Sequence, residues 1–253
     1  MPRSSFGGRH ELGQNFLHHR PTIARMTELV TASGGSILEL GAGDGAVTRA
    51  LAALGRPLTA VELDEHRAGA LRRALPSVVI LHADLLRVPF DDDTIVGNIP
   101  FHLTTPVLRR LMSSGRWTRA VLLTQWEVAR KRAGVGGGTL LTAQSAPWFT
   151  VELRGRVPSW AFTPRPSVDG GLLQIERRDS PLVPFDERRA YEAFARRVFS
   201  ARGRGLTRIL ETATGVTPQR AARALDAARA RQMSLPRDLR PEQWAALWRA
   251  VRG

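Results

Sequence analysis

The sequence has no cysteine, only one lysine and no long apolar run. Without cysteine there can be no disulfide, thiolate zinc site, iron–sulfur cluster or cysteine nucleophile. No apolar stretch approaches the roughly 20 residues of a membrane-spanning helix, and the polar, basic start of the chain is unlike a secretion signal. We therefore expect a cytoplasmic protein without membrane contact, whose chemistry depends on groups other than thiols.

Charge is distributed unevenly along the chain. Lys131 is the only lysine among 37 basic residues, so the sign of the charge is more informative than the preference for arginine. Residues 1–100 carry 10 basic and 11 acidic residues, whereas residues 101–253 carry 27 and 12. Solubility alone does not require this asymmetry. It predicts a near-neutral half that binds a small molecule, joined to a surface for a polyanion.

The first part of the chain has the pattern of an α/β fold. Its 253 residues are 43% hydrophobic and 24% charged, which is enough to bury a large core. Short apolar runs alternate with helix-like segments, as in a parallel sheet with crossover helices. The expected strands are residues 36–40, 58–62, 78–82, 94–97, 120–123, 148–153 and 172–176, the last two antiparallel. The expected helices are residues 46–54, 65–75 and 106–112, with Thr105 as the cap of the third. We predict a Rossmann-like, seven-stranded domain.

The last part of the chain is expected to be helical. Strand signals stop after residue 186, and Thr217 and Pro241 are typical of helix starts. Four apolar residues then recur at helical spacing: Trp244, Leu247, Trp248 and Val251. The two tryptophans could stack on bases, but this spacing is more often that of a core, and we predict packing. The expected domains are residues 1–178 and 179–253.

A glycine-rich turn follows the first parallel strand. Gly41 and Gly43 stand in Gly41-Ala42-Gly43-Asp44-Gly45, where residues without side chains let the backbone approach a ligand at the edge of a sheet. With Ala46 the turn also fits a dinucleotide fingerprint. Glu62, 21 residues past Gly41, could accept hydrogen bonds from a ribose diol. On these residues alone, a nicotinamide enzyme is a fair alternative.

Two further carboxylates favour a different ligand. Glu39, on the strand before the glycines, would repel a pyrophosphate but suits a ligand with a cationic amino-acid end. Asp84 closes the third strand, where it could accept a hydrogen bond from an adenine amine. S-adenosylmethionine has this amine, a ribose diol and a cationic sulfonium, and it has no phosphate. One such acid is usually a cap or a solvated group, but the joint spacing at successive strand ends favours a cofactor site.

The fourth strand ends in a segment suited to methyl transfer. In Gly97-Asn98-Ile99-Pro100-Phe101, the Asn98 amide oxygen and the Ile99 carbonyl could accept both hydrogens of an aromatic amine, while Pro100 stiffens the backbone. These acceptors would direct the nitrogen lone pair of an adenine at a sulfonium methyl group, with no metal required. Phe101 could stack on one face of the base and Phe162, in a proline-flanked surface loop, on the other.

Together these residues resemble a known family, the rRNA adenine N6-methyltransferases, which include the Erm antibiotic-resistance enzymes and the KsgA small-subunit dimethylases. Its motifs occur here in order as Gly13-Gln14-Asn15-Phe16-Leu17, Glu39-Leu40-Gly41-Ala42-Gly43, Glu62-Leu63-Asp64, Ala83-Asp84-Leu85 and Asn98-Ile99-Pro100-Phe101. Residues 9–17 and 199–206 are most similar to the actinobacterial Erm branch. The family's fourth motif usually ends in tyrosine; Phe101 preserves stacking but provides no hydroxyl.

The resemblance implies S-adenosylmethionine as cofactor and one adenine of naked or immature 23S rRNA as substrate, with resistance to macrolides, lincosamides and streptogramin B. We expect a monomer. Asn15 and Leu17 would contact the methionine part of the cofactor, and Asn98 both the cofactor and the target amine. The remaining expected cofactor-binding residues are Gly41, Gly43, Glu62, Leu63, Asp84 and Leu85.

Basic residues predict where RNA binds. Arg130 and Lys131 follow the expected fifth strand, and Arg202 and Arg204 flank a glycine at a turn of the helical domain. Guanidinium groups bind phosphates in a bidentate manner, so we expect these residues on the RNA path. Two alternatives share the cofactor motifs: a KsgA-type enzyme acting on 16S rRNA, and a non-catalytic nucleic-acid-binding protein on the same fold.

Overall fold

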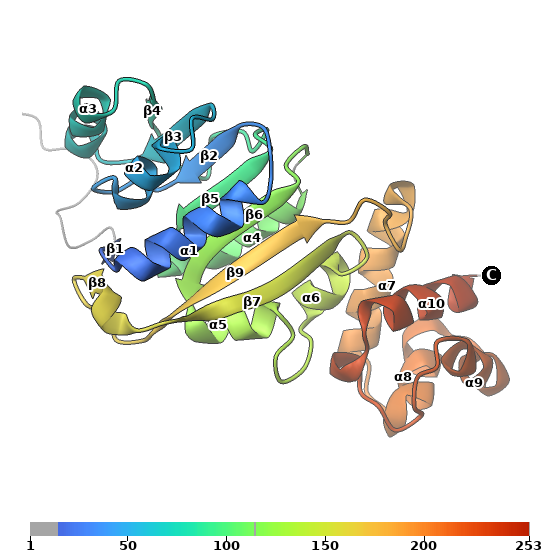
Figure 1. Cartoon of the computed structure of the whole chain (residues 1–253). Helices are drawn as coiled ribbons and strands as arrows, with labels where there is room; N and C mark the ends of the chain where they lie inside the picture. Colours follow the sequence, from blue (N-terminus) through green and yellow to red (C-terminus); the bar gives the residue numbers. More distant parts are fainter. Residues whose placement is uncertain (1–14, 114, 253) are drawn as a thin grey trace, which may run out of the picture. The chain divides into compact units, whose positions relative to one another are not determined.

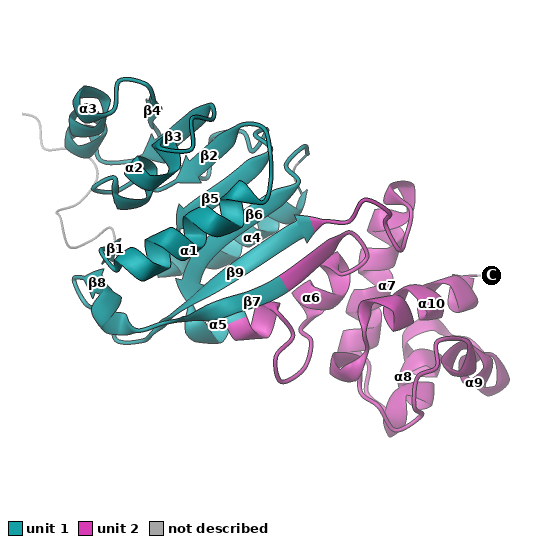
Figure 2. Cartoon of the chain, in the orientation of Figure 1, with its two compact units in different colours: residues 1–129, 152–176 teal, residues 130–151, 177–253 magenta. Residues whose placement is uncertain are grey.

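The computed structural model describes residues 15–113 and 115–252, and the chain forms two compact units (Figure 2). Unit 1 comprises residues 1–129 and 152–176, and unit 2 comprises residues 130–151 and 177–253. This division differs from the predicted one, because residues 130–151 group with the C-terminal helices. Their contacts explain this: the Tyr191 hydroxyl donates to the Ala143 carbonyl at 2.8 Å, and the Trp148 and Tyr191 rings lie 5.4 Å apart.

Seven strands form a mixed sheet in the order β4-β3-β2-β5-β6-β9-β7 (Figure 1). The first five in this order are parallel, and β9 runs antiparallel to β6. Their bounds are β2 (Ile37–Leu40), β3 (Leu58–Glu62), β4 (Val79–His82), β5 (Thr94–Asn98), β6 (Arg119–Gln125), β7 (Phe149–Val157) and β9 (Gly170–Arg177). The predicted Rossmann-like α/β class is confirmed.

The central strands are apolar because helices cover the sheet. All four residues of β2 are buried, as are Thr94–Gly97 of β5, which is the pattern of parallel strands enclosed on both faces. Figure 1 shows α1 and α4 on opposite faces of the sheet. The helices that begin in unit 1 are α1 (Arg20–Thr31), α2 (Ala46–Ala52), α3 (Glu65–Ala74), α4 (Thr104–Ser113) and α5 (Trp126–Arg132).

A side-chain cap marks the start of α3 but not that of α4. The Asp64 side chain accepts a hydrogen bond from the Arg67 amide at 3.0 Å and so caps α3. The predicted cap at Thr105 is wrong. A 3₁₀ turn, η1 (Phe101–Leu103), runs directly into α4, so the α-helix already begins at Thr104 and Thr105 lies inside it.

A two-stranded sheet that the sequence pattern did not indicate joins β1 (Phe16–Leu17) to β8 (Phe162–Thr163). The strands are antiparallel, with Leu17 opposite Phe162, and the His18 amide donates to the Ala161 carbonyl at 3.0 Å. Ala161 ends a short 3₁₀ turn, η2 (Ser159–Ala161). This pairing connects the first described residues to the loop before β9.

Unit 2 is built on helices around an aromatic core. Tyr191 and Phe194 are fully buried, and Trp244 and Trp248 are 2% and 8% exposed, so the predicted packing role of the tryptophans is confirmed. Thr217 caps α9 through the Arg220 amide, also as predicted. The helices are α6 (Leu140–Ser145), α7 (Arg188–Ser200), α8 (Gly205–Thr214), α9 (Pro218–Ala227) and α10 (Pro241–Arg252). Over the described part of the chain, no helix combines the length and apolarity needed to cross a membrane.

Candidate functional site

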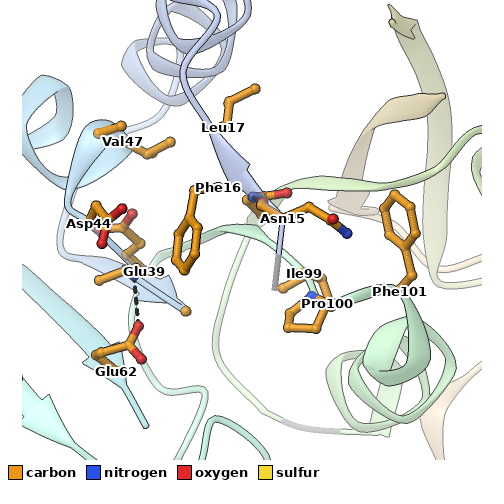
Figure 3. A pocket seen from close by; sticks show the side chains of 15 residues that line it. Asn15, Phe16, Leu17, Glu39, Asp44, Val47, Glu62, Ile99, Pro100 and Phe101 are labelled. Carbon is orange, nitrogen blue, oxygen red and sulfur yellow. Dashed lines mark hydrogen bonds between the residues drawn. The ribbon is translucent and has the colours of Figure 1, made fainter. Parts of the chain in front are cut away.

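A cavity open to solvent lies at the carboxyl edge of β2, β3 and β5 in unit 1 (Figure 3). The parallel register brings these strand ends together, since Leu40 lies opposite Val61 on one side and Glu39 opposite Val96 on the other. Its lining includes four groups of residues that the sequence selected: Asn15 and Leu17, Gly41 and Gly43, Glu62, and Asn98–Phe101. Gly13 and Gln14 lie outside the described residues.

The glycine turn has a backbone conformation that residues with a side chain rarely adopt. Gly41 and Gly43 have φ angles of 75° and 57°, and the amides of Gly41 and Ala42 both donate to the Val61 carbonyl at 2.9 Å. A Cβ atom at Gly43 would lie 3.0 Å from the Phe16 ring. The turn therefore presents bare backbone to the cavity, as a close-fitting ligand requires.

Glu62 connects two turns. One carboxylate oxygen accepts from the Gly43 amide at 2.7 Å, and the other accepts from the Asp64 amide at 2.9 Å. The residue is 1% exposed. Each carboxylate oxygen has a second lone pair, so Glu62 can still accept hydrogen bonds from a diol.

Glu39 is the strongest electrostatic feature of the cavity. It is 2% exposed, and one of its carboxylate oxygens has no hydrogen-bond partner. Burial raises the pKa of Glu39 to about 8, and the nearby Glu62 carboxylate adds to the increase. A cationic group entering the cavity would supply the interaction that this carboxyl lacks.

A second cavity adjoins the first and shares Gly41, Glu62 and Pro100 with it. Asp84 lies in its wall, where one carboxylate oxygen accepts from the Leu86 amide at 2.8 Å. The other predicted residues of this region, Leu63 and Leu85, line the same cavity. The structure thus places all the predicted cofactor-binding residues around two adjoining cavities.

Asn98 is held in a defined orientation at the end of β5. Its Nδ2 atom donates to the Asn15 carbonyl at 2.7 Å, so the amide oxygen on the other side of the same group is directed away from Asn15. The next residue, Ile99, is 1% exposed and its amide donates to the Leu123 carbonyl at 3.0 Å. Asn98 is therefore anchored through its side chain and Ile99 through its backbone.

The two aromatic residues predicted to hold a base occupy different environments. Phe101 lies at the opposite end of the cavity from Glu39 and Glu62 (Figure 3). Phe162 is 2% exposed and packs in the core with Leu17. Its predicted surface position is wrong, because the β1–β8 pairing turns the side chain inward.

Phe16 is a cavity residue that the motifs did not single out for a role. Its ring lies between the carboxylates and Phe101 in the view of Figure 3. The Arg67 guanidinium carbon lies 4.5 Å from the ring centroid, and Arg67 forms ion pairs with Asp44 at 2.9 Å and Asp64 at 3.0 Å. The clue in the sequence was the position of Phe16 between Asn15 and Leu17, but the partner Arg67 is 51 residues away.

The basic residues predicted to bind RNA belong to unit 2. Arg130 and Lys131 end α5, and Arg202 and Arg204 lie in the exposed segment between α7 and α8. Unit 2 contains 20 arginine and lysine residues and 8 acidic residues. Most of the surplus positive charge of the chain therefore lies in the helical unit.

The sheet topology, the glycine turn and the acids at successive strand ends define a Rossmann-like methyltransferase that uses S-adenosylmethionine. The comparison with protein families is more specific. Residues 5–247 match the model for ribosomal RNA adenine dimethylase, and the chain belongs to this family. It is an rRNA adenine N6-methyltransferase, as predicted, and the dehydrogenase alternative is excluded.

Two relatives and one solved structure are similar over most of the chain. Mycinamicin-resistance protein MyrB of Micromonospora griseorubida is 49% identical, covering 97% of this chain and 80% of that protein. An rRNA adenine N-6-methyltransferase of Corynebacterium diphtheriae is 50% identical, and the match covers 82% of this chain and 84% of that protein. The crystal structure of the 23S rRNA methyltransferase ErmE has a TM-score of 0.84 at 31% identity and covers 94% of this chain and all of that one.

Proposed function

We propose that this enzyme methylates N6 of one adenine in 23S rRNA and thereby confers resistance to macrolides, lincosamides and streptogramin B. The names of its relatives support this target: one is a mycinamicin-resistance protein, and the solved structure is that of a 23S rRNA methyltransferase. In this proposal the enzyme acts in the cytoplasm as a monomer, without a metal, on naked or immature rRNA.

The residues of the two cavities fit S-adenosylmethionine. The unpartnered oxygen of Glu39 suits the cationic methionine end, which Asn15 and Leu17 would flank. Gly41 and Gly43 give the close approach, and Glu62 binds the ribose. Asp84, between Leu63 and Leu85 in the adjoining cavity, accepts from the adenine amine. When bound, the cofactor supplies a methyl group on a positively charged sulfur. The sulfur is a good leaving group because it becomes a neutral thioether when the methyl group is transferred.

Asn98 prepares the target amine. The exocyclic nitrogen of adenine is a poor nucleophile because its lone pair is delocalised into the ring. Oxygen acceptors at its two hydrogens, from the Asn98 amide and the Ile99 carbonyl, favour a pyramidal nitrogen whose lone pair is directed at the methyl group. Proline at position 100 keeps these acceptors fixed, and Phe101 stacks on the base.

One observation carries this proposal: the hydrogen bond of 2.7 Å from Asn98 Nδ2 to the Asn15 carbonyl. In this bond the amide nitrogen of Asn98 donates to the protein's own backbone, so the amide oxygen can accept a hydrogen bond from the substrate. Asn15 and Asn98 also line the same cavity as Glu39 and Glu62, so the acceptor faces the cofactor site. The target adenine must leave its RNA stack to reach this position.

The test is transfer of labelled methyl groups to separate 23S and 16S transcripts, with the modified nucleotide located by primer extension and mass. We expect label only in 23S, on N6 of a single adenine. The variant Asn98→Ala should lower kcat at least about a hundredfold with RNA affinity retained. Gln219→Ala, which removes an exposed side-chain amide from α9, serves as the matched control.

Each alternative has its own result in this experiment. Label in 16S rRNA and none in 23S would support the small-subunit enzyme. A protein that binds RNA but gives no calorimetric signal with S-adenosylmethionine would be a non-catalytic binder. Full turnover by Asn98→Ala would contradict the mechanism while leaving the choice of rRNA unaffected.

A further inference from the structure

Unit 2 contains a cavity of about 600 Å³ that takes no part in the cofactor site, and the described residues in its wall all belong to this unit. Three stretches of chain form most of it: residues 132–138, residues 142–151, and residues 237–241, which lead from η4 (Pro236–Asp238) into α10. These stretches are distant in the sequence, so only the folded unit brings them together.

The cavity wall is strongly basic. Its described lining contains one carboxylate, Asp238, and four arginines: Arg132, Arg178, Arg237 and Arg240. The Asp238 carboxylate is engaged in the wall itself, since it accepts from the Leu235 amide at 2.8 Å and lies 3.9 Å from the Arg237 side chain. The charge presented to a ligand is therefore positive.

Hydrogen bonds orient the arginines on one side of the cavity. Arg178 Nε donates to the Ala146 carbonyl at 3.0 Å, and Arg132 Nη1 donates to the Thr139 hydroxyl at 3.1 Å. Arg237 and Arg240 lie on the other side and are exposed. A guanidinium has five N–H donors in a planar fork, so an arginine that donates to the wall can also donate to a phosphate.

The glycine loop brings the two sides close. Gly134, Gly136 and Gly137 have φ angles of 73°, 85° and 113°, which side chains rarely tolerate. The Gly138 amide donates to the Arg237 carbonyl at 2.7 Å, and a Cβ atom at Gly137 would lie 3.5 Å from the Arg237 side chain. The loop therefore packs against the segment that carries Arg237 and Arg240.

The cavity continues along the surface of unit 2. Arg237 also lines a shallow groove of about 380 Å³ together with Arg202 and Gly203. Arg237 is common to the cavity and the groove, and the groove carries a further arginine, so positively charged side chains extend from one to the other. The continuity favours an extended polyanion.

We propose that this arginine cavity binds successive backbone phosphates of the RNA substrate, and that Arg237 connects it to Arg202. The inference rests on the proposed function and adds a site to it. Phosphate contacts position an RNA without reading its bases, so the site contributes affinity and register rather than sequence recognition.

The test compares two double variants in binding to a 23S hairpin transcript that contains the target adenine. Arg237→Gln with Arg240→Gln removes two charges from the cavity. Arg223→Gln with Arg231→Gln removes two exposed charges from positions outside its lining. We expect the cavity variant to weaken binding by roughly a hundredfold, about tenfold for each contact, and to flatten the plot of log affinity against log salt by about 1.4 to 1.8.

Controls separate this inference from the proposed function. S-adenosylmethionine binding, measured by calorimetry, should be unchanged in both variants. Equal losses in the two variants, or an unaltered salt slope in the cavity variant, would overturn the phosphate site. Loss of inorganic pyrophosphate binding with full RNA affinity would instead identify a small-anion site and overturn it too. If the unmodified protein binds S-adenosylmethionine but no rRNA, the proposed function itself fails.

Discussion

Replacement of Glu39 by glutamine should make the protein without cofactor more stable at alkaline pH. Burial raises the pKa of Glu39 from an ordinary 4.5 to about 8. Below pH 4.5 the folded and unfolded chains both hold the proton. Between pH 4.5 and 8 only the unfolded chain has lost it, so the free energy of unfolding falls as the pH rises, and above pH 8 the loss is complete. The difference of 3.5 pKa units corresponds to a loss of about 5 kcal/mol.

Glu39→Gln cannot ionise and should escape this loss. The assay is urea unfolding of both proteins between pH 4.5 and 8.5, with the difference in unfolding free energy plotted against pH. The difference should grow in favour of the variant up to pH 8 and then remain constant. Two parallel curves would show that Glu39 titrates normally and would refute the reasoning.

The same carboxyl should release a proton when a cationic ligand binds. At pH 6.5 the folded protein keeps Glu39 protonated, and a positive charge in the cavity stabilises the ionised form. Calorimetry in two buffers of different ionisation enthalpy should therefore detect release of about one proton per S-adenosylmethionine bound. Glu39→Gln, compared under the same conditions, should show no such release from this position.

Three further substitutions test other parts of the structure. Phe16→Ala should weaken S-adenosylmethionine binding by about tenfold in calorimetry, because it removes one wall of the cavity and the ring beneath Arg67; unchanged affinity would show that the ring is not a wall. Phe162→Ala should lower the free energy of unfolding by about 3 to 5 kcal/mol, as expected for a core side chain; a change confined to RNA binding would restore the predicted surface role. Gly97→Ala should reduce thermal stability, because its Cβ atom would lie 2.5 Å from the Leu40 carbonyl; an unchanged Tm would contradict that close packing.

The sequence predicted the parallel sheet well because the signals are local. Apolar runs marked β2 to β6, and the observed bounds differ from the predicted ones by at most two residues. Acids and glycines at strand ends could be assigned to one edge because parallel strands must end there together. The residues that line the two cavities could therefore be predicted from the sequence alone.

Features that depend on pairing between segments distant in the sequence could not be predicted. The strands β1 and β8 have two residues each, too few to show any periodicity, and their pairing determines that Phe162 is buried. A proline-flanked loop ordinarily indicates the surface, which is why the prediction for Phe162 failed. Helix α1 was also missed: it has no side-chain cap at His19 and no acidic residue in its first turn.

Glu62 holds the Gly43 and Asp64 amides through hydrogen bonds made within the chain itself. The conformational entropy of these two turns is therefore lost during folding and not during ligand association. A nucleoside entering the cavity meets a Glu62 carboxylate whose orientation is set by these two amides. Compounds that carry little more than the ribose diol should gain affinity from this fixed orientation, since the protein has already been preorganised for them.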